Sequence, residues 1–213
     1  MKHIIFIVGS LRKKSFNRQL AKVAEDFLKN RYEISYLDFQ DIPYMNQDLE
    51  SQFSQKLPGV ISQHISGDGE LESGNNSRHL IAESICIRNV RHEIQGCDGI
   101  WVFTPEYNRS YPGLLKNLFD WLSRPMDVSN FANPTAVQGK KITVSGAGGK
   151  NKTSSCREKL NELLQYIKMQ VMTEPQVGIE LGMEAWVKGE FRLTDEQMKQ
   201  IEEQAERFAE FVG

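Results

Sequence analysis

Cysteine is scarce in this chain of 213 residues, which has only three, at Cys86, Cys97 and Cys156. An odd and widely spaced set does not suit the disulfide framework of a small secreted protein. Histidine is also scarce and shares no metal-ligand spacing with the cysteines, so we expect no metal site at His3, His64, His79 or His92. The composition predicts a reducing compartment, and we expect the protein to be cytoplasmic.

Long hydrophobic runs and strong net charge are absent as well. The longest apolar stretches, residues 4–8 and 100–103, have the length of a strand, whereas a membrane helix needs about 20 residues. The first residues do not show the apolar core and cleavage site of a signal peptide. A net charge of −2 argues against a protein that binds nucleic acid mainly through phosphates. We therefore expect neither a membrane nor a nucleic acid as partner.

No Pro-, Gly- or Ser-rich linker and no internal repeat divides the chain, and we expect a single domain over residues 1–213. One stretch, residues 47–78, is polar and shows no sustained apolar period, so it is predicted to be a long insertion. A helix is expected to resume near Arg78, because isoleucines recur at spacings compatible with one helix face, at Ile81, Ile85 and Ile94.

Elsewhere, short apolar runs alternate with the apolar spacing of helices, which is the pattern of an α/β protein with a parallel sheet covered by helices. Strands are expected at residues 4–8, 32–37, 100–104, 140–145 and 170–172. The third of these is apolar throughout and bounded by Gly99 and Pro105, so it is expected to lie in the centre of the sheet.

Several helix starts carry recognisable signals. Pro112 suits the first turn of a helix. Ser155 and Glu158 have the spacing of a capping box, and Thr194 and Gln197 repeat that spacing before the last helix. The inward face of the last helix is expected to consist of apolar residues, namely Met198, Ile201, Ala205, Phe208 and Val212.

The segment after the first strand, residues 9–18, combines hydroxyls, an amide and cations where a strand turns into a helix. The backbone N–H groups and the dipole of a helix N-terminus favour a phosphate there. We expect Ser10, Ser15 and Asn17 to add neutral donors and Arg12 to add a bidentate, charge-assisted contact. The alternative is that Ser15 or Asn17 is only an N-cap and that the cations are solvated.

Three well-known phosphate motifs do not fit the chain. The P-loop requires glycine at the position of Lys14, and the dinucleotide fingerprint fails at Asn151. A cysteine phosphatase carries an arginine at a fixed spacing after its nucleophile, and that spacing leads here to His92, Phe103 and Glu162.

Two further segments follow later strands, and ligands of an open parallel sheet bind beyond the carboxyl ends of the strands. Residues 104–113 carry an aromatic ring, a carboxylate and an amide around two prolines, so their backbone amides could face a planar polar ring. Residues 145–149 lack bulky side chains, which lets backbone donors approach a ligand closely. A plain flexible turn is the alternative for this last segment.

These segments resemble the NADPH-dependent FMN reductases, a flavodoxin-like family that includes quinone, azo-dye and chromate reductases. The resemblance rests on three motifs: Gly9-Ser10-Leu11-Arg12 continuing to Ser15-Phe16-Asn17-Arg18, Thr104-Pro105-Glu106-Tyr107-Asn108 with Ser110 and Pro112-Gly113, and Leu115-Lys116-Asn117 with Asp120-Trp121 and Ser123-Arg124-Pro125. The glycine-rich segment at 146–149 is the weakest match. The insertion at 47–78 is longer than in typical relatives.

The resemblance implies an α/β, flavodoxin-like three-layer sandwich with a five-stranded parallel sheet of order 2-1-3-4-5 and helices on both faces. It implies noncovalently bound FMN, with its phosphate held by Ser10, Arg12, Ser15, Asn17 and the backbone of Phe16. The isoalloxazine ring would be bordered by two other segments, through Pro105, Glu106, Tyr107, Asn108, Ser145, Gly148 and Gly149. The resemblance also implies a homodimer or homotetramer formed through the helix after Pro112, and it favours Phe119 and Trp121 as interface residues over core residues.

The function expected from this resemblance is that of an FMN-dependent oxidoreductase. Hydride passes from NADPH or NADH to FMN, and a quinone, an azo compound, a metal oxyanion or free flavin is then reduced. Because the cofactor carries the redox chemistry, we assign no catalytic side chain. A nonenzymatic flavodoxin-type electron carrier is the main alternative, and a module that binds a nucleotide without turnover is a third. The cationic first loop and the near-neutral charge favour the enzyme.

Overall fold

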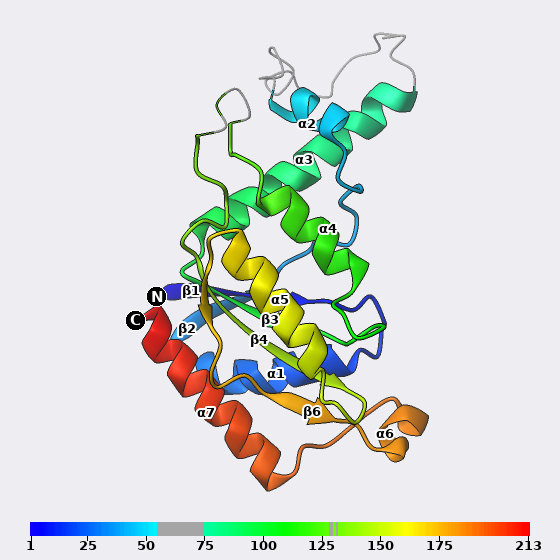
Figure 1. The fold of residues 1–213 in the computed structure, drawn as a ribbon, viewed down its shortest axis with the longest axis vertical. Coiled ribbons are helices and arrows are strands. Elements are labelled where there is room, and N and C mark those ends of the chain that lie inside the picture. Colours follow the sequence, from blue (N-terminus) through cyan, green and yellow to red (C-terminus); the bar gives the residue numbers. More distant parts are fainter. Residues whose placement is uncertain (55–74, 128–129, 131) are drawn as a thin grey trace, which may run out of the picture.

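The computed structural model describes residues 1–54, 75–127, 130 and 132–213 and has an α/β fold (Figure 1). Its strands are β1 (Lys2–Val8), β2 (Tyr32–Tyr36), β3 (Gly99–Phe103), β4 (Lys141–Gly148), β5 (Gln170–Met172) and β6 (Gly178–Glu180). The first five pair in parallel in the order β2-β1-β3-β4-β5, and β6 pairs in parallel with β4. The sheet order expected from the resemblance is confirmed.

Helices cover both faces of this sheet (Figure 1). They are α1 (Phe16–Leu28), α2 (Gln47–Ser54), α3 (Asn75–Gly96), α4 (Gly113–Leu122), α5 (Ser154–Tyr166), α6 (Met183–Lys188) and α7 (Asp195–Val212). Buried residues of α1 and α7 pack on one face, and buried residues of α3, α4 and α5 pack on the other. The three-layer arrangement is therefore confirmed.

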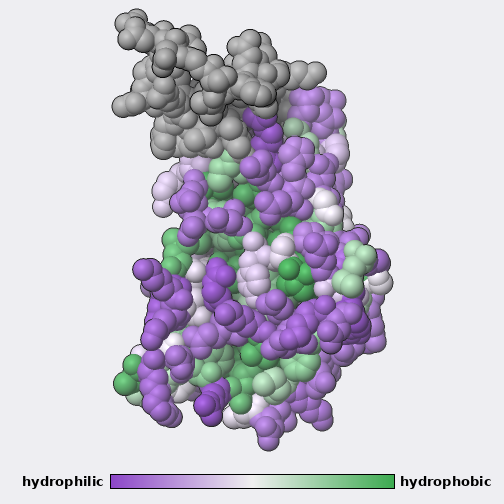
Figure 2. All heavy atoms as spheres, turned by 180° about the vertical axis from the view of Figure 1, so that it is seen from behind, coloured by the Kyte–Doolittle hydropathy of each residue, from purple (hydrophilic) through white to green (hydrophobic). Residues whose placement is uncertain are grey.

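Two apolar cores result from the alternation of side chains along the strands. In β1, Ile5 and Ile7 pack toward α4 and α5, whereas Phe6 packs toward α1 and α7. Phe6 contacts Trp101 and Phe103 of β3 with ring centroids 5.8 and 5.0 Å apart. The surface over these layers is mainly hydrophilic when the molecule is seen from behind, with hydrophobic residues showing between polar ones (Figure 2).

The fourth strand is longer than predicted, and a sixth strand was missed. Gly146, Ala147 and Gly148, expected in a loop, continue β4 and pair with Gly178, Ile179 and Glu180 of β6. The first part of β4 pairs with β5 instead, so β4 changes neighbour along its length. With three residues, β6 shows no period in the sequence, although β5, which has three residues as well, was predicted.

One of the two capping boxes is confirmed and the other is wrong. Thr194 and Gln197 form the complete box at the start of α7, although Met198 behind it is 38% exposed rather than inward. The N-cap of α5 is Thr153, with left-handed φ of 59° and no side-chain cap, so Ser155 lies inside the helix. A carboxylate from another loop supplies the missing acceptor there, as described below.

The insertion predicted at 47–78 begins as a helix, because its first residues form α2. The following helix, α3, begins at Asn75, a little before the expected Arg78. Ile94 lies in the core as expected, while the remainder of the insertion and the side chains of Ile81 and Ile85 lie outside the described residues. Within the described part of the chain, no helix is both long and apolar enough to cross a bilayer.

Candidate cofactor-binding site

The carboxyl ends of β1, β3 and β4 lie side by side, so the loops that follow them meet at one edge of the sheet (Figure 1). In the register of the sheet, Val8 pairs with Phe103, and Phe103 pairs with Ser145. Just beyond, the Gly9 N–H donates to the Phe103 carbonyl at 2.9 Å, and the Thr104 N–H donates to the Ser145 carbonyl at 2.9 Å. The structure therefore brings the three expected loops together.

Two glycines permit this close approach. A Cβ at Gly9 would lie 2.8 Å from a side-chain atom of α4. A Cβ at Gly146 would lie 2.5 Å from the Thr104 carbonyl oxygen and would also meet the Thr153 hydroxyl. A side chain at Gly146 would therefore push the loops after β3 and β4 apart. Gly149 has no atom within 4 Å of its Cβ position, so its backbone is open to a ligand.

The first loop ends at a capped helix. The Ser15 hydroxyl accepts the Arg18 N–H at 3.2 Å, and Ser15 is buried. Ser15 is therefore the N-cap of α1. The N–H groups of Phe16 and Asn17, in the first turn of α1, have no acceptor inside the helix. These N–H groups and the helix dipole still favour an anion, so the cap at Ser15 does not exclude a phosphate there.

Arg12 lies over an aromatic platform. Its exposed guanidinium carbon is 5.1 Å from the centroid of the Phe16 ring, which is buried. Phe16 in turn packs edge-on against Trp186 of α6 and Phe191, at 5.2 and 6.0 Å between centroids. A guanidinium that lies over a ring keeps the N–H donors along its own edge accessible to a ligand. The Phe16 ring therefore positions the Arg12 side chain. The backbone N–H of Phe16 is available to a ligand as well.

Asn17 does not present a free amide to a phosphate. Its side chain is buried, its Oδ1 accepts the Ala147 N–H at 2.8 Å, and its Nδ2 donates to the Ala147 carbonyl at 3.2 Å. The expectation of a free amide donor missed this contact, because β4 was predicted to end before Ala147. The side chain of Asn17 thus joins the first loop to the third, and its backbone N–H remains for a ligand.

The second loop contains a tight turn. Tyr107 and Ser110 exchange two backbone hydrogen bonds of 2.9 and 3.0 Å, and both residues between them are left-handed, with φ of 51° at Asn108 and 59° at Arg109. Two left-handed central residues are the mark of a type I′ turn, which is a stiff structure. Tyr107 is 50% exposed, so its ring and the neighbouring backbone face solvent.

Glu106 connects this second loop to α5. One of its carboxylate oxygens accepts the Cys156 N–H at 3.0 Å, and the other accepts the Asn151 side-chain amide at 2.5 Å. A carboxylate at a helix N-terminus satisfies a free N–H and interacts favourably with the helix dipole. The Glu106 side chain therefore anchors the loop, which leaves its backbone and that of half-buried Pro105 at the edge of the sheet.

Ser145 lies in the core rather than at the edge. Its hydroxyl accepts the Trp101 indole N–H at 3.0 Å and donates to the Gln204 side chain at 2.8 Å. Gln204, which the sequence pattern did not single out, is fully buried, accepts the Val177 N–H at 2.8 Å and donates to the Thr143 hydroxyl at 2.9 Å. The signal that identifies Gln204 is its place on the apolar face of the last helix. Only the Ser145 backbone reaches the three loops.

Most of the third motif of the resemblance lies away from this edge, although the Leu115 side chain lies beside Gly9. Asn117 of α4 donates to the Pro43 carbonyl at 2.9 Å and accepts the Met45 N–H at 2.7 Å, and the Trp121 indole donates to Pro43 at 2.8 Å. Trp121 is 2% exposed and Phe119 is fully buried. The expectation that these two rings form a subunit interface is therefore wrong, because both are buried in the core, with the chain after β2 hydrogen-bonded to Trp121.

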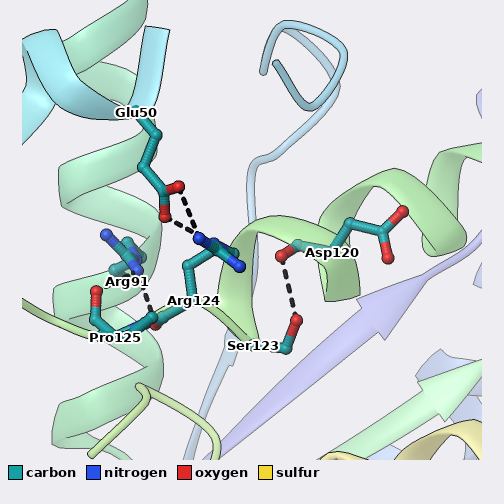
Figure 3. Close-up of polar contacts among 6 residues, drawn as sticks. All are labelled: Glu50, Arg91, Asp120, Ser123, Arg124 and Pro125. Atoms are coloured by element: carbon teal, nitrogen blue, oxygen red, sulfur yellow. Dashed lines mark hydrogen bonds and ion pairs between the residues drawn. The ribbon is translucent and has the colours of Figure 1, made fainter. Parts of the chain in front are cut away.

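The end of the same motif fastens α2 and α3 to α4 (Figure 3). Arg124 donates to both carboxylate oxygens of Glu50, at 2.6 and 2.8 Å. Arg91 donates to the carbonyls of Arg124 and Pro125, at 2.6 and 2.8 Å. Glu50 and Arg91 are both buried. These contacts build the body of the protein beside the candidate site and do not take part in the site.

The cysteines are free thiols, as the composition predicted. Burial raises the pKa of the Cys156 thiol to about 11, and burial raises that of Cys97 to about 11. Both thiols are protonated at neutral pH, so neither is a ready nucleophile. Among the residues that the structure describes, no group of histidine, cysteine, aspartate and glutamate side chains could hold a metal ion. His64 and the side chain of His79 lie outside the described residues.

The arrangement suits a ligand with a phosphate at one end and a flat polar ring system at the other. The first turn of α1, the Ser10 hydroxyl and Arg12 are the donors that a phosphate dianion requires. The stiff turn around Asn108 and the open backbone at Gly149 offer N–H groups to a planar ring without side chains in the way. The residues present therefore fit FMN.

Comparison with known proteins identifies the family. The sequence profile of the NADPH-dependent FMN reductases matches residues 2–184. A 2-hydroxy-1,4-benzoquinone reductase from Burkholderia sp is 29% identical over 177 residues, which are 83% of this chain and 77% of that protein.

Solved structures agree with this comparison. The structure of FerB, a flavoenzyme NAD(P)H:(acceptor) oxidoreductase from Paracoccus denitrificans, matches with a TM-score of 0.74 and 25% identity, over 100% of this chain and 97% of FerB. A flavodoxin from the domain Archaea matches with a TM-score of 0.55 and 13% identity, over 100% and 99% of the two chains, which shows the fold alone. Because the family profile spans most of the chain, including all three loops, the protein belongs to the NADPH-dependent FMN reductase family, oxidoreductases that use FMN with a nicotinamide cofactor.

Proposed function

We propose that this protein transfers hydride from NADPH or NADH to bound FMN and from there to a quinone. The observation that carries the proposal is the meeting of three loops at one edge of the sheet, where the N-terminus of α1 and Arg12 lie beside a stiff, exposed turn. The acceptor is chosen because the Burkholderia relative is named for the reduction of a benzoquinone.

In this proposal the first loop holds the FMN phosphate. Ser10 and Ser15 contribute hydroxyls, Arg12 contributes its guanidinium, and Phe16 and Asn17 contribute backbone N–H groups of the first helical turn. The buried side chain of Asn17 keeps the loop attached to β4. We expect the charge-assisted contact of Arg12 to supply the largest single share of the phosphate affinity.

The other two loops border the ring system. Pro105, Glu106, Tyr107 and Asn108 lie on one side, and the backbones of Ser145, Gly148 and Gly149 lie on the other. Bound FMN supplies a ring that accepts hydride and gives up electrons. N–H groups held rigidly by the Glu106 anchor and the type I′ turn stabilise negative charge on that ring, because donors that are already oriented need no reorganisation. The open space at Gly149 keeps one face accessible to the nicotinamide and the acceptor.

The exposed groups near this edge favour a flat aromatic acceptor. Tyr107 is 50% exposed and Trp186, which packs on Phe16, is 49% exposed. Aromatic rings of this kind stack on quinones and azo dyes, whereas a metal oxyanion gains nothing from them. Chromate is therefore the weaker candidate. The free thiols support a reducing compartment, and we propose that the protein acts in the cytoplasm.

A homodimer or homotetramer through α4 remains part of the proposal, but the face involved is polar. The outward side chains of α4 include Lys116 and Asp120, which form an ion pair at 2.6 Å. Light scattering coupled to size exclusion tests this directly. A particle larger than the monomer that dissociates in the Lys116→Glu variant supports an interface at α4, and a monomer at all concentrations refutes it.

Anaerobic stopped-flow reduction tests the proposed function. The FMN-loaded protein is mixed with NADPH or NADH, and 1,4-benzoquinone, an azo dye, chromate or free FMN is then added in separate experiments. We expect the flavin absorbance to bleach with a nicotinamide and to return fastest with the quinone. Bound flavin that neither nicotinamide reduces would identify an electron carrier instead.

A further inference from the structure

A cavity lies on the side of the first loop that faces away from the other two loops. It has a volume of about 370 Å³ and lies between the loop after β1 and the chain after β2, with Arg18 of α1 at its wall. Because β2 and β3 flank β1 on opposite sides, this cavity lies on the other side of the first loop from the space between the loops after β1, β3 and β4, and Ser10 and Arg12 of that loop line it as well. Its size is within the range of small-ligand pockets.

The cavity is rich in positive charge. Arg12, Lys13 and Arg18 line it, and the carboxylate among its lining residues is that of Asp38. All three cations are exposed, so they are accessible to a ligand from solvent. Low-dielectric walls concentrate the field of such a cluster, which raises the local concentration of an anion. Arg12 is given to the FMN phosphate in the proposed function, so Lys13 and Arg18 are the two lining cations left for a second anion.

The arginine at the wall is held in place. The Arg18 guanidinium carbon lies 5.5 Å from the centroid of the Tyr36 ring, and the Tyr36 hydroxyl donates to Glu25 at 2.7 Å. Burial and this bond to Glu25 raise the pKa of Tyr36, so the ring stays neutral and its hydroxyl stays a donor. Glu25 is thus engaged by Tyr36. A planar guanidinium fixed over a ring presents its N–H donors and its flat face to a ligand.

A ligand of the proposed reaction has the required chemistry. NADPH and NADH differ only in the 2′-phosphate on the adenosine ribose, at the end of the molecule away from the nicotinamide. We propose that this cavity binds the 2′-phosphoadenosine end of NADPH through Lys13 and Arg18, with Arg12 shared between the two sides of the loop, and so makes NADPH the preferred donor. This inference rests on the proposed function, since it concerns the donor in that reaction.

Isothermal titration of the FMN-loaded protein with 2′,5′-ADP and with 5′-ADP tests the cavity without turnover. The two probes differ in the 2′-phosphate, and we expect 2′,5′-ADP to bind about tenfold more tightly or better. Lys13→Glu and Arg18→Ala should each abolish most of that difference. Both side chains are exposed, so the variants should fold, which thermal unfolding verifies.

Lys14→Glu is the matched control. It makes the same charge change one residue away, but Lys14 does not line the cavity, and its side chain lies near Gly189, beyond α6. We expect Lys14→Glu to change the binding of 2′,5′-ADP by less than about twofold, because exposed charges at a distance are screened at physiological salt. Equal losses in the Lys13 and Lys14 variants, or equal binding of the two probes by the wild type, would overturn the inference.

Stopped-flow reduction separates this inference from the proposed function. If both nicotinamides reduce the flavin with the same kcat/KM, in the wild type and in Lys13→Glu, the cavity does not select NADPH while the function stands. If NADPH is preferred and Lys13→Glu removes the preference, the inference is supported. If neither nicotinamide reduces the flavin, the proposed function fails, and the titration still decides whether the cavity binds a 2′-phosphate.

Discussion

Asn17 and Ala147 exchange two hydrogen bonds, so that the start of α1 is tied to the last residues of β4. The Asn17 amide oxygen accepts the Ala147 N–H at 2.8 Å, and the Asn17 amide nitrogen donates to the Ala147 carbonyl at 3.2 Å. Both residues are buried. The first and third loops of the candidate site are therefore joined directly, and a ligand held by both meets contacts that are already formed.

Replacing Asn17 tests this connection. In Asn17→Ala, the buried N–H and carbonyl of Ala147 lose their partners, and we expect the free energy of unfolding to fall by about 1 to 3 kcal/mol. Urea unfolding measures the change. Lys22→Ala, on an exposed position of the same helix, is the control and should change it by less than about 0.5 kcal/mol. Equal effects of the two variants would show that the contact does not stabilise the fold.

Two neighbouring glycines differ in the space around them. We expect Gly146→Ala to destabilise the protein by about 1 to 3 kcal/mol, because its Cβ would lie 2.5 Å from the Thr104 carbonyl oxygen. Gly149→Ala is the matched variant, since no atom lies within 4 Å of its Cβ position. In thermal unfolding, the midpoint temperature of the Gly146 variant should lie clearly below that of the Gly149 variant. A Gly146 variant as stable as the Gly149 variant would mean that the loops can part without cost.

Two substitutions of Glu106 should destabilise the protein to different degrees. Glu106→Ala removes the acceptor of the Cys156 N–H at the start of α5, and we expect a loss of about 1 kcal/mol in the free energy of unfolding. Glu106→Gln keeps one side-chain oxygen and should lose less. Urea unfolding without FMN measures the free energy of unfolding. Titration of the same variants with FMN measures their affinity for FMN, which depends on the position of the second loop. Full stability in Glu106→Ala would show that the carboxylate does not cap the helix.

The buried thiols predict a loss of stability at high pH. The pKa of Cys97 and that of Cys156 are each raised from 9.0 to about 11 in the folded protein, mainly by burial. A raised pKa means that the folded state keeps its proton where the unfolded state loses it. The stabilisation is complete below pH 9 and is lost as pH rises toward 11, by up to about 1.4 kcal/mol per pH unit for each thiol.

Urea unfolding between pH 8 and pH 11 measures this slope, and Cys156→Ala is the comparison. The variant should lose stability less steeply over the same interval, because one of the two thiols is gone. Identical slopes in the wild type and the variant would indicate that Cys156 titrates alike in the folded and unfolded states.

Much of the fold was predictable because its central strands, β1 and β3, are apolar and its strands are separated by periodic helices. The run Ile100–Phe103 identifies a central strand by itself, and the Thr194–Gln197 pair identifies the start of α7. Two short elements, β6 and α6, were missed because their few residues show no period, although β5, which is as short as β6, was predicted. The extent of β4 was missed for the same reason, because its last residues are strand only through their pairing with β6.

The candidate site was predictable at the level of loops but not of side chains. Residue types placed Ser15 and Glu106 correctly at the edge of the sheet, because motifs at strand ends must meet there. Their contacts depend on partners far away in the chain, and no local pattern predicts that Glu106 caps α5 or that Trp121 packs under the chain after β2. The resemblance therefore gave Trp121 a wrong interface role, and the capping-box spacing gave Ser155 a wrong cap.

The central claim, that the first loop binds the phosphate of FMN at the meeting point of the three loops, is tested most directly by fluorescence titration of the protein with FMN. We predict saturable binding in the wild type and a loss of about 1.5 to 3 kcal/mol, roughly 10- to 150-fold in Kd, in Arg12→Ala. Lys14→Ala should bind FMN as the wild type does. No binding of FMN by the wild type, or equal affinity in Arg12→Ala, would contradict the account.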